Sequence, residues 1–242
     1  MSGDRSPLRY APWLARDVAM GPGVLFLVVI AVVCAVFWRL SQGAQNMFPI
    51  TAELIQVNML NSVIIIAVLI AVGGIVSGDA HNGYYRAFFS KPMPVWWYYL
   101  QRWILGGIAV MLIPVVLGLG LNLVLGEGHG ITAALMANVA IGFLLVGGAV
   151  LLLSVFTRRD WLIVFVVATA QRAFASFIEV GLPVNEATKM AWQALPPFHL
   201  LKPGSPMLEG RPLLHAVGYG LAMTVIALVL LRVRPLGSGG RA

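Results

Sequence analysis

The chain has 242 residues, of which 60% are hydrophobic and only 10% are charged, and its mean hydropathy is +0.89. A soluble domain carries about 25% charged residues, so this composition excludes an ordinary soluble fold. The single cysteine, Cys34, lies in an apolar run, which excludes a disulfide framework and a cysteine-ligated metal site within the chain.

Six apolar stretches are suited to crossing a membrane. A bilayer core of about 30 Å requires about 20 apolar residues in a helix. We therefore expect an all-α, polytopic membrane protein in which residues 1–242 form one domain, with six transmembrane helices at about 23–40, 60–78, 98–125, 131–156, 161–182 and 213–231. The first stretch lacks a small-x-small cleavage site, so we expect it to remain as a span.

The N-terminal residues 8–20 have the pattern of an interfacial helix. Tyr10, Leu14 and Val18 recur at a spacing of four residues and share one face. The sequence Gly-Pro-Gly at 21–23 then predicts a break before the first span, so that residues 8–20 would form an elbow helix. A disordered basic tail is the alternative.

The positions of Lys and Arg predict the orientation of the six spans. With a cytoplasmic N-terminus, eleven of the 16 Lys and Arg residues lie inside, four lie outside, and Arg172 falls within a span. We therefore expect a multi-pass protein of the cytoplasmic (inner) membrane, with both termini in the cytoplasm. The net charge of +7 follows from this bias, and no nucleic-acid partner is expected.

Glycines near the end of the second span predict close helix packing. Gly74 and Gly78 are four residues apart, a spacing that lets another helix approach closely.

A polar and aromatic segment, residues 79–91, follows that span on the predicted cytoplasmic side. Asp79 is positioned to cap a short helix, and Lys91 and Pro92 are suited to its end. The aromatic residues fall on one face of this helix, with Asp79 and Arg86 opposite them. Such a helix suits either the lipid headgroup layer or the groove of a cytoplasmic partner.

The spacing of this segment resembles the loop between the second and third membrane helices of the ABC-2 family of ABC-transporter permeases. The matching residues are Asp79, Gly83, Phe88, Phe89 and Pro92, followed by Tyr98 and Arg102. Further along the chain, Leu153 and Ser154 precede a basic turn, Arg158–Arg159, as in that family. The chain departs from the family where Asp79 replaces the usual glutamate, where Tyr84 replaces a threonine, and where Val95 occupies a frequent arginine position.

This resemblance implies a permease subunit of an ABC transporter, an exporter by family precedent, without catalytic residues or a metal site of its own. A separate cytoplasmic ATPase would carry ATP and Mg²⁺, no cofactor is expected on this chain, and two permease copies would pair as a homo- or heterodimer within the membrane lipid. The segment 79–91 would act as a short coupling helix. The expected coupling residues are Asp79, Asn82, Gly83, Tyr84, Tyr85, Arg86, Phe89, Arg158 and Arg159.

Two charged residues lie within the predicted fifth span. Arg172 and Glu179 are seven residues apart on one helix face. A charge at the bilayer centre costs at least ~2.5 kcal/mol, so these residues face a translocation path or lie in the outer headgroup zone. The next outer segment contains Leu-Pro-Pro-Phe-His-Leu-Leu at 195–201, for which we expect short helical pieces that are partly re-entrant.

Three other functions remain open from the sequence. The spacing of Asp79, Gly83 and Arg86 resembles part of the aspartate-rich motif of the CDP-alcohol phosphatidyltransferases, but the next carboxylate, Glu127, is expected across the membrane. A membrane enzyme of lipid metabolism and a non-transporting structural subunit are therefore the alternatives. His129, His199 and His215 are expected on the outer side, which leaves haem or metal handling as a third.

Overall fold

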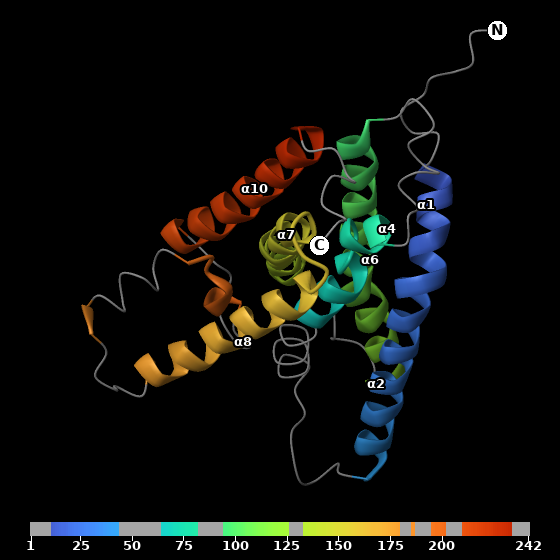
Figure 1. Cartoon of the computed structure of the whole chain (residues 1–242). Helices are drawn as coiled ribbons and strands as arrows, with labels where there is room; N and C mark the ends of the chain where they lie inside the picture. The colour runs from blue at the N-terminus through green and yellow to red at the C-terminus, as the bar shows by residue number, and fades with distance from the viewer. Residues whose placement is uncertain are drawn as a thin grey trace, which may run out of the picture.

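The computed structural model of the chain describes residues 11–43, 64–81, 94–125, 133–179, 185–186, 195–201 and 210–233. Every regular element within these ranges is helical (Figure 1). Their bounds are α1 Ala11–Val18, η1 Ala19–Gly23, α2 Val24–Gly43, α4 Ser77–His81, α6 Val95–Leu125, α7 Ala133–Ser154, α8 Asp160–Glu179, η2 Phe198–Leu200 and α10 Gly210–Val233. Residues 64–72 are also helical.

Four helices of the described residues are long and apolar enough to cross a membrane: Ala11–Val36, Val95–Gly120, Ala133–Ser154 and Gly210–Val233. They match the expected first, third, fourth and sixth spans. The expectation of an all-α, multi-pass membrane protein is therefore confirmed. The second and fifth spans correspond to the shorter apolar helix Ile64–Ala80 and to α8, and for these two the crossing of a membrane stays a prediction.

The predicted break at residues 21–23 is absent. Instead, α1 and α2 are joined by the π-helical turn η1 into one continuous helix, the long blue rod of Figure 1. Pro22 has no backbone N–H and disrupts an ordinary α-helix. The wider π-turn accommodates it, because the N–H of Val24 reaches back five residues to the carbonyl of Ala19. The prediction of an elbow was therefore wrong for the described part of this helix, which begins at Ala11.

The first helix packs along α6. Leu14 is fully buried, and both α1 and α2 contact α6. The apolar spacing that predicted a helix over residues 8–20 therefore identified a face that packs against protein.

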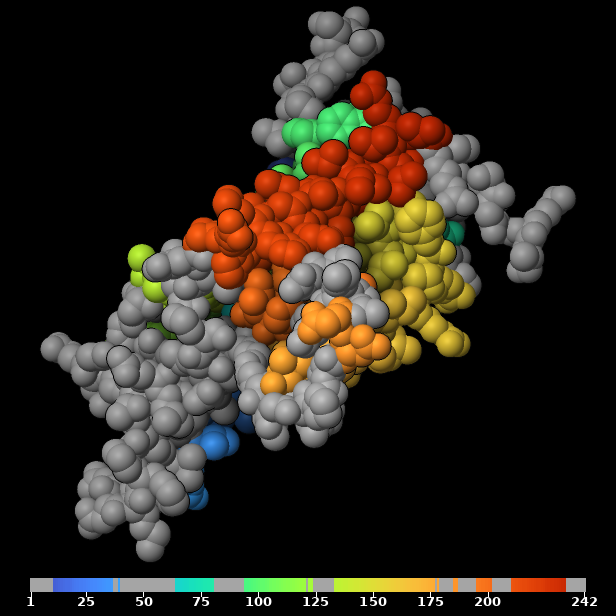
Figure 2. All heavy atoms as spheres, turned by 90° about the vertical axis from the view of Figure 1, so that its left-hand side faces the viewer, coloured from blue at the N-terminus to red at the C-terminus, as the bar shows by residue number. Residues whose placement is uncertain are grey.

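The most extensive helix contact joins α7 and α10. Figure 2 shows α10, in red-orange, covering one side of the molecule next to the yellow residues of α7 and α8. The two backbones approach closely because glycines face each other. A Cβ added at Gly148 would lie 2.7 Å from the carbonyl oxygen of Gly220, and one added at Gly220 would lie 2.8 Å from the carbonyl oxygen of Leu144. Small residues are what permit such an approach in lipid, where the hydrophobic effect does not drive helices together.

We predict that Gly220→Ala lowers the free energy of unfolding by about 1–3 kcal/mol, because the new methyl group would overlap Leu144. The matched control is Gly218→Ala, two residues away on the same helix, where an added Cβ meets nothing within 4 Å. Gly218→Ala should leave stability unchanged or raise it by up to about 1 kcal/mol. Denaturation in detergent micelles measures both values, and equal effects of the two variants would contradict the tight contact.

Candidate functional site

The second apolar helix ends in a turn at residues 73–76, before α4 begins. Gly74 has a φ of +66°, a left-handed conformation in which a side chain is strained. A Cβ at Gly73 would lie 2.3 Å from the carbonyl oxygen of Leu69, so this position also requires glycine. The prediction that Gly74 and Gly78 form a helix-packing pair was wrong: Gly74 lies in the turn that ends the helix, and a Cβ at Gly78 would meet nothing within 4 Å.

Two side chains from the α7–α8 region bind the backbone of this turn. The hydroxyl of Ser154 accepts hydrogen bonds from the N–H groups of Val76 at 2.8 Å and Ser77 at 3.2 Å. The carboxylate of Asp160 accepts one from the N–H of Gly74 at 2.9 Å. Both side chains belong to buried residues, with Asp160 0% and Ser154 2% exposed. They satisfy N–H groups at the start of α4 that have no partner within that helix.

A charged cluster lies just beyond the turn. The guanidinium of Arg102, in the second turn of α6, donates to the Asp79 carboxylate at 2.9 Å and to the carbonyl of Ile75 at 3.5 Å. Its other terminal nitrogen lies 3.9 Å from the carboxylate of Asp17 in α1. The side chains of Arg102 and Asp79 are 25% and 12% exposed, whereas that of Asp17 is 55% exposed. Arg102 therefore links α1, α4 and α6 through one short ion pair and one long one.

Burial and neighbouring hydrogen-bond donors shift the pKa values of the two carboxyl groups next to the turn in opposite directions. Burial raises the pKa of Asp79, and the Arg102 guanidinium opposes this rise by favouring the carboxylate. Burial also raises the pKa of Asp160, and the hydrogen bond from the N–H of Gly74 opposes it. Each carboxylate thus has a donor that compensates part of its desolvation.

The role predicted for Asp79 as a helix cap was wrong. The helix begins earlier, at Ser77, and Asp79 lies in its first turn. The backbone N–H groups there are bound by Ser154 and Asp160, which lie far away in the same chain. Asp79 instead pairs with Arg102. The carboxylate still lies near the positive end of the helix dipole, as the sequence predicted. Asp17 and Asp160 did not enter the predicted site. Asp160 had a recognisable signal, because it directly precedes an apolar run, where acidic helix caps are common.

The other predicted coupling residues fall into two groups. Arg158 and Arg159 are exposed in the turn between α7 and α8, the same turn that reaches Gly74 through Asp160. The remaining residues lie outside the described part of the chain: Asn82, Gly83, Tyr84, Tyr85, Arg86 and Phe89.

The contacts around Asp79 and Asp160 agree with a topology in which successive spans cross the membrane in opposite directions. Asp17, Asp79 and the residues of the α7–α8 turn come from three segments that the six-span topology places on one side of the membrane. Which side faces the cytoplasm stays a prediction from the Lys and Arg count.

Arg172 binds the backbone of the η2 turn. Its guanidinium donates to the carbonyl of Leu201, and the neighbouring Gln171 side chain accepts from the N–H of Phe198 at 3.0 Å. Phe198 is 2% exposed, so the η2 turn packs into the protein against α8. Non-helical backbone at membrane depth requires such partners. Arg172 thus has a structural role in holding the turn, and the side chain of Glu179 lies outside the described residues.

The histidine and carboxylate residues do not form a metal site in the part of the chain that is described. No three His, Cys, Asp or Glu side chains come close enough there to hold an ion. His215 stacks on Tyr219 with a centroid separation of 4.9 Å, and His129 lies outside the described residues.

Comparison of the chain with protein-family models, curated proteins and solved structures found no match. The resemblance to ABC-2 permeases therefore depends on the residues of the sequence itself.

We predict that Ser154→Ala lowers the free energy of unfolding by about 1–3 kcal/mol, because it leaves two buried N–H groups without their acceptor. Ser176→Ala is the matched control, since its exposed hydroxyl bonds only to the carbonyl of Arg172 in its own helix. That variant should change stability by less than about 0.5 kcal/mol. Hydrogen exchange should also show faster exchange at Val76 and Ser77 in Ser154→Ala alone.

A double-mutant cycle tests the ion pair. We predict that Arg102→Gln and Asp79→Asn each cost about 1–3 kcal/mol of unfolding free energy, and that the double variant costs less than their sum. Asp17→Asn is the control, because Asp17 is more than half exposed and lies at 3.9 Å. Its effect should stay below about 0.5 kcal/mol. Additive effects of Arg102→Gln and Asp79→Asn would show that the pair contributes nothing.

Proposed function

We propose that this chain is the transmembrane permease subunit of an ABC transporter. In this proposal a separate cytoplasmic ATPase binds ATP and Mg²⁺, and the segment 79–91 transmits its movement to the spans. A second permease copy completes the transporter, and export is the direction that the family resemblance favours. The segment and its spacing are the sequence features behind the proposal, and the network around Asp79 is the structural observation that supports it.

The network connects the start of the coupling segment to three other parts of the chain. Asp79 is held by Arg102 of α6, and Arg102 also approaches Asp17 of α1. The turn directly before Asp79 is held by Asp160 and Ser154 from the α7–α8 region. A force applied to residues 79–91 would therefore act on α1, α6, α7 and α8 together.

The local chemistry makes this connection stiff. Moving the turn away from Ser154 and Asp160 would leave buried N–H groups without acceptors, which costs about 1–3 kcal/mol for each group. Separating Asp79 from Arg102 would leave two largely buried charges without each other as partners. Rigid-body movement of the whole end of the bundle avoids both costs, and such movement is a common form of conformational switching.

Arg158 and Arg159 provide an exposed positive surface at the same end. Neither has a carboxylate partner among the ion pairs of the described residues. In the proposal they contact acidic residues of the ATPase next to the coupling segment. Charged residues at the rim of an interface mainly increase the rate of association and the specificity.

The first test is whether a neighbouring gene encodes a Walker-motif ATPase. The chain is then co-purified with that ATPase, and ATP hydrolysis is measured in liposomes. We expect a stable complex and stimulation of hydrolysis by this chain. We predict that the double variant Arg158→Glu/Arg159→Glu weakens ATPase binding about tenfold or more, since it places like charges opposite each other.

Arg211→Glu is the control, because Arg211 is an exposed arginine at the start of α10. It should leave ATPase binding unchanged. A chain that binds no ATPase would contradict the proposal and favour a membrane enzyme of lipid metabolism. A complex without stimulated hydrolysis would favour a structural subunit.

A further inference from the structure

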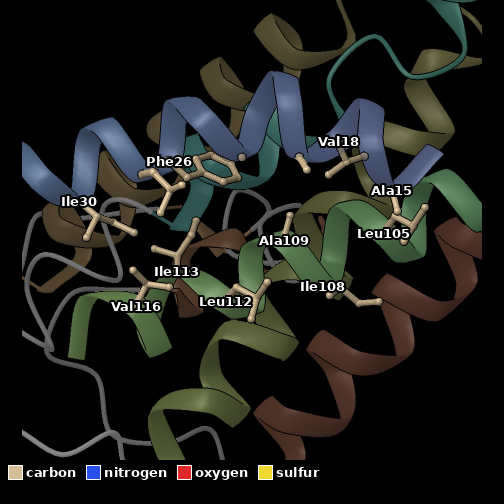
Figure 3. A pocket seen from close by; sticks show the side chains of 13 residues that line it. Ala15, Val18, Phe26, Ile30, Leu105, Ile108, Ala109, Leu112, Ile113 and Val116 are labelled. Carbon is tan, nitrogen blue, oxygen red and sulfur yellow. The ribbon is translucent and has the colours of Figure 1, made fainter. Parts of the chain in front are cut away.

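An apolar groove runs between the first helix and α6. Its volume is about 300 Å³, and residues of α1, η1 and α2 form one wall while α6 forms the other (Figure 3). All 13 residues that line it are apolar. Its occupant must therefore be apolar along the whole length of the groove.

The groove exists because several residues of the first helix that face α6 have small side chains. On α6 the lining residues recur every three or four positions from Leu105 to Val116, so they form one stripe along the helix. The facing stripe begins with Ala15, Ala19 and Gly23. Side chains this small cannot fill the space between two helices, whereas Phe26 and Ile30 beyond them are buried.

The length of the groove matches one leaflet of a bilayer. Leu105 and Val116 are eleven residues apart, which corresponds to about 17 Å along a helix. Half of a bilayer core is about 15 Å. The groove starts three residues after Arg102, whose charged cluster marks the water boundary, and it lies within two helices that can span a membrane.

The volume of about 300 Å³ leaves room between the two helices for an apolar group of limited size, such as a hydrocarbon chain.

The groove is also open to lipid. Leu27, Ile108 and Leu112 at its walls are 56%, 51% and 52% exposed. Water is disfavoured in a space whose lining side chains are all apolar, and an empty space leaves its lining without contacts. We propose that one acyl chain of a phospholipid, from the leaflet next to Arg102, occupies this groove. Because the lining side chains are apolar throughout, the site binds the acyl chain and does not distinguish between headgroups. This inference does not depend on the proposed function.

A phospholipid with a photoreactive diazirine on its acyl chain tests the proposal. The full chain is reconstituted in lipid nanodiscs that contain this probe, and the labelled residues are mapped by mass spectrometry. We expect the lining residues of α6 and α2 to be labelled at least about fivefold more than other exposed positions of the spans. Ala109→Phe fills the groove and should reduce this labelling about fivefold, because the phenyl ring occupies the space of the acyl chain.

Ala222→Phe is the matched control, since Ala222 is an exposed alanine on α10 and lies outside the groove. It should leave labelling of the groove unchanged. Ala19→Leu fills the groove from the opposite wall and replaces Ala109→Phe should that variant fail to fold. Even labelling of all exposed span positions, or labelling that neither filling variant reduces, would overturn the proposal.

A second copy of the chain is the competing occupant. A cysteine introduced as Ile108→Cys in a Cys34→Ala background reports on it, because Cys34 is the only native cysteine. High-yield disulfide dimers through this position, together with the absence of lipid labelling, would overturn the proposal. Lipid labelling without such dimers is the expected result.

Discussion

The structure depends on one constraint: backbone N–H and C=O groups in an apolar environment must have hydrogen-bond partners. Continuous helices satisfy most of this constraint within themselves. Within the described residues, two turns outside such helices are bound by polar side chains from elsewhere in the chain. At residues 74–77 the side chains of Ser154 and Asp160 accept hydrogen bonds from backbone N–H groups. At residues 198–201 the side chains of Gln171 and Arg172 bind one N–H and one carbonyl. The polar residues Ser154, Asp160, Gln171 and Arg172 thus serve as hydrogen-bond partners of these turns.

The helix α6 connects the two features with functional interest. Its second turn carries Arg102, which holds Asp79 and approaches Asp17. Its following turns carry one wall of the apolar groove, from Leu105 to Val116. A change in the charged cluster would thus shift the same helix that forms one wall of the groove. In the proposed ABC permease, α6 would therefore connect an acyl chain bound in the groove to the coupling segment.

Two predictions from the sequence were wrong because the structure there depends on a residue distant in the chain. Gly74 and Gly78 have the spacing of a packing motif, but Gly74 lies in a turn with a positive φ, and Asp160, 86 residues away, binds its N–H. Asp79 has the position of a cap, but Ser154 supplies that function and leaves Asp79 to pair with Arg102. Pro22 between two glycines predicts a break, but a π-turn carries the helix through. Local rules could not anticipate the partners of Gly74 and Asp79, whereas the π-turn at Pro22 is a local alternative to the predicted break.

The sequence by itself determined the all-α class and the four long apolar helices, because the length and hydropathy of each are local properties set by the thickness of the bilayer. The choice of the segment after the second helix as the coupling region stays a prediction. Only the tertiary structure decided which side chains meet there, and it alone revealed the groove. Both depend on how the helices pack: a hydrogen bond needs two groups within about 3 Å, and this groove needs the small residues of the first helix to face the apolar stripe of α6.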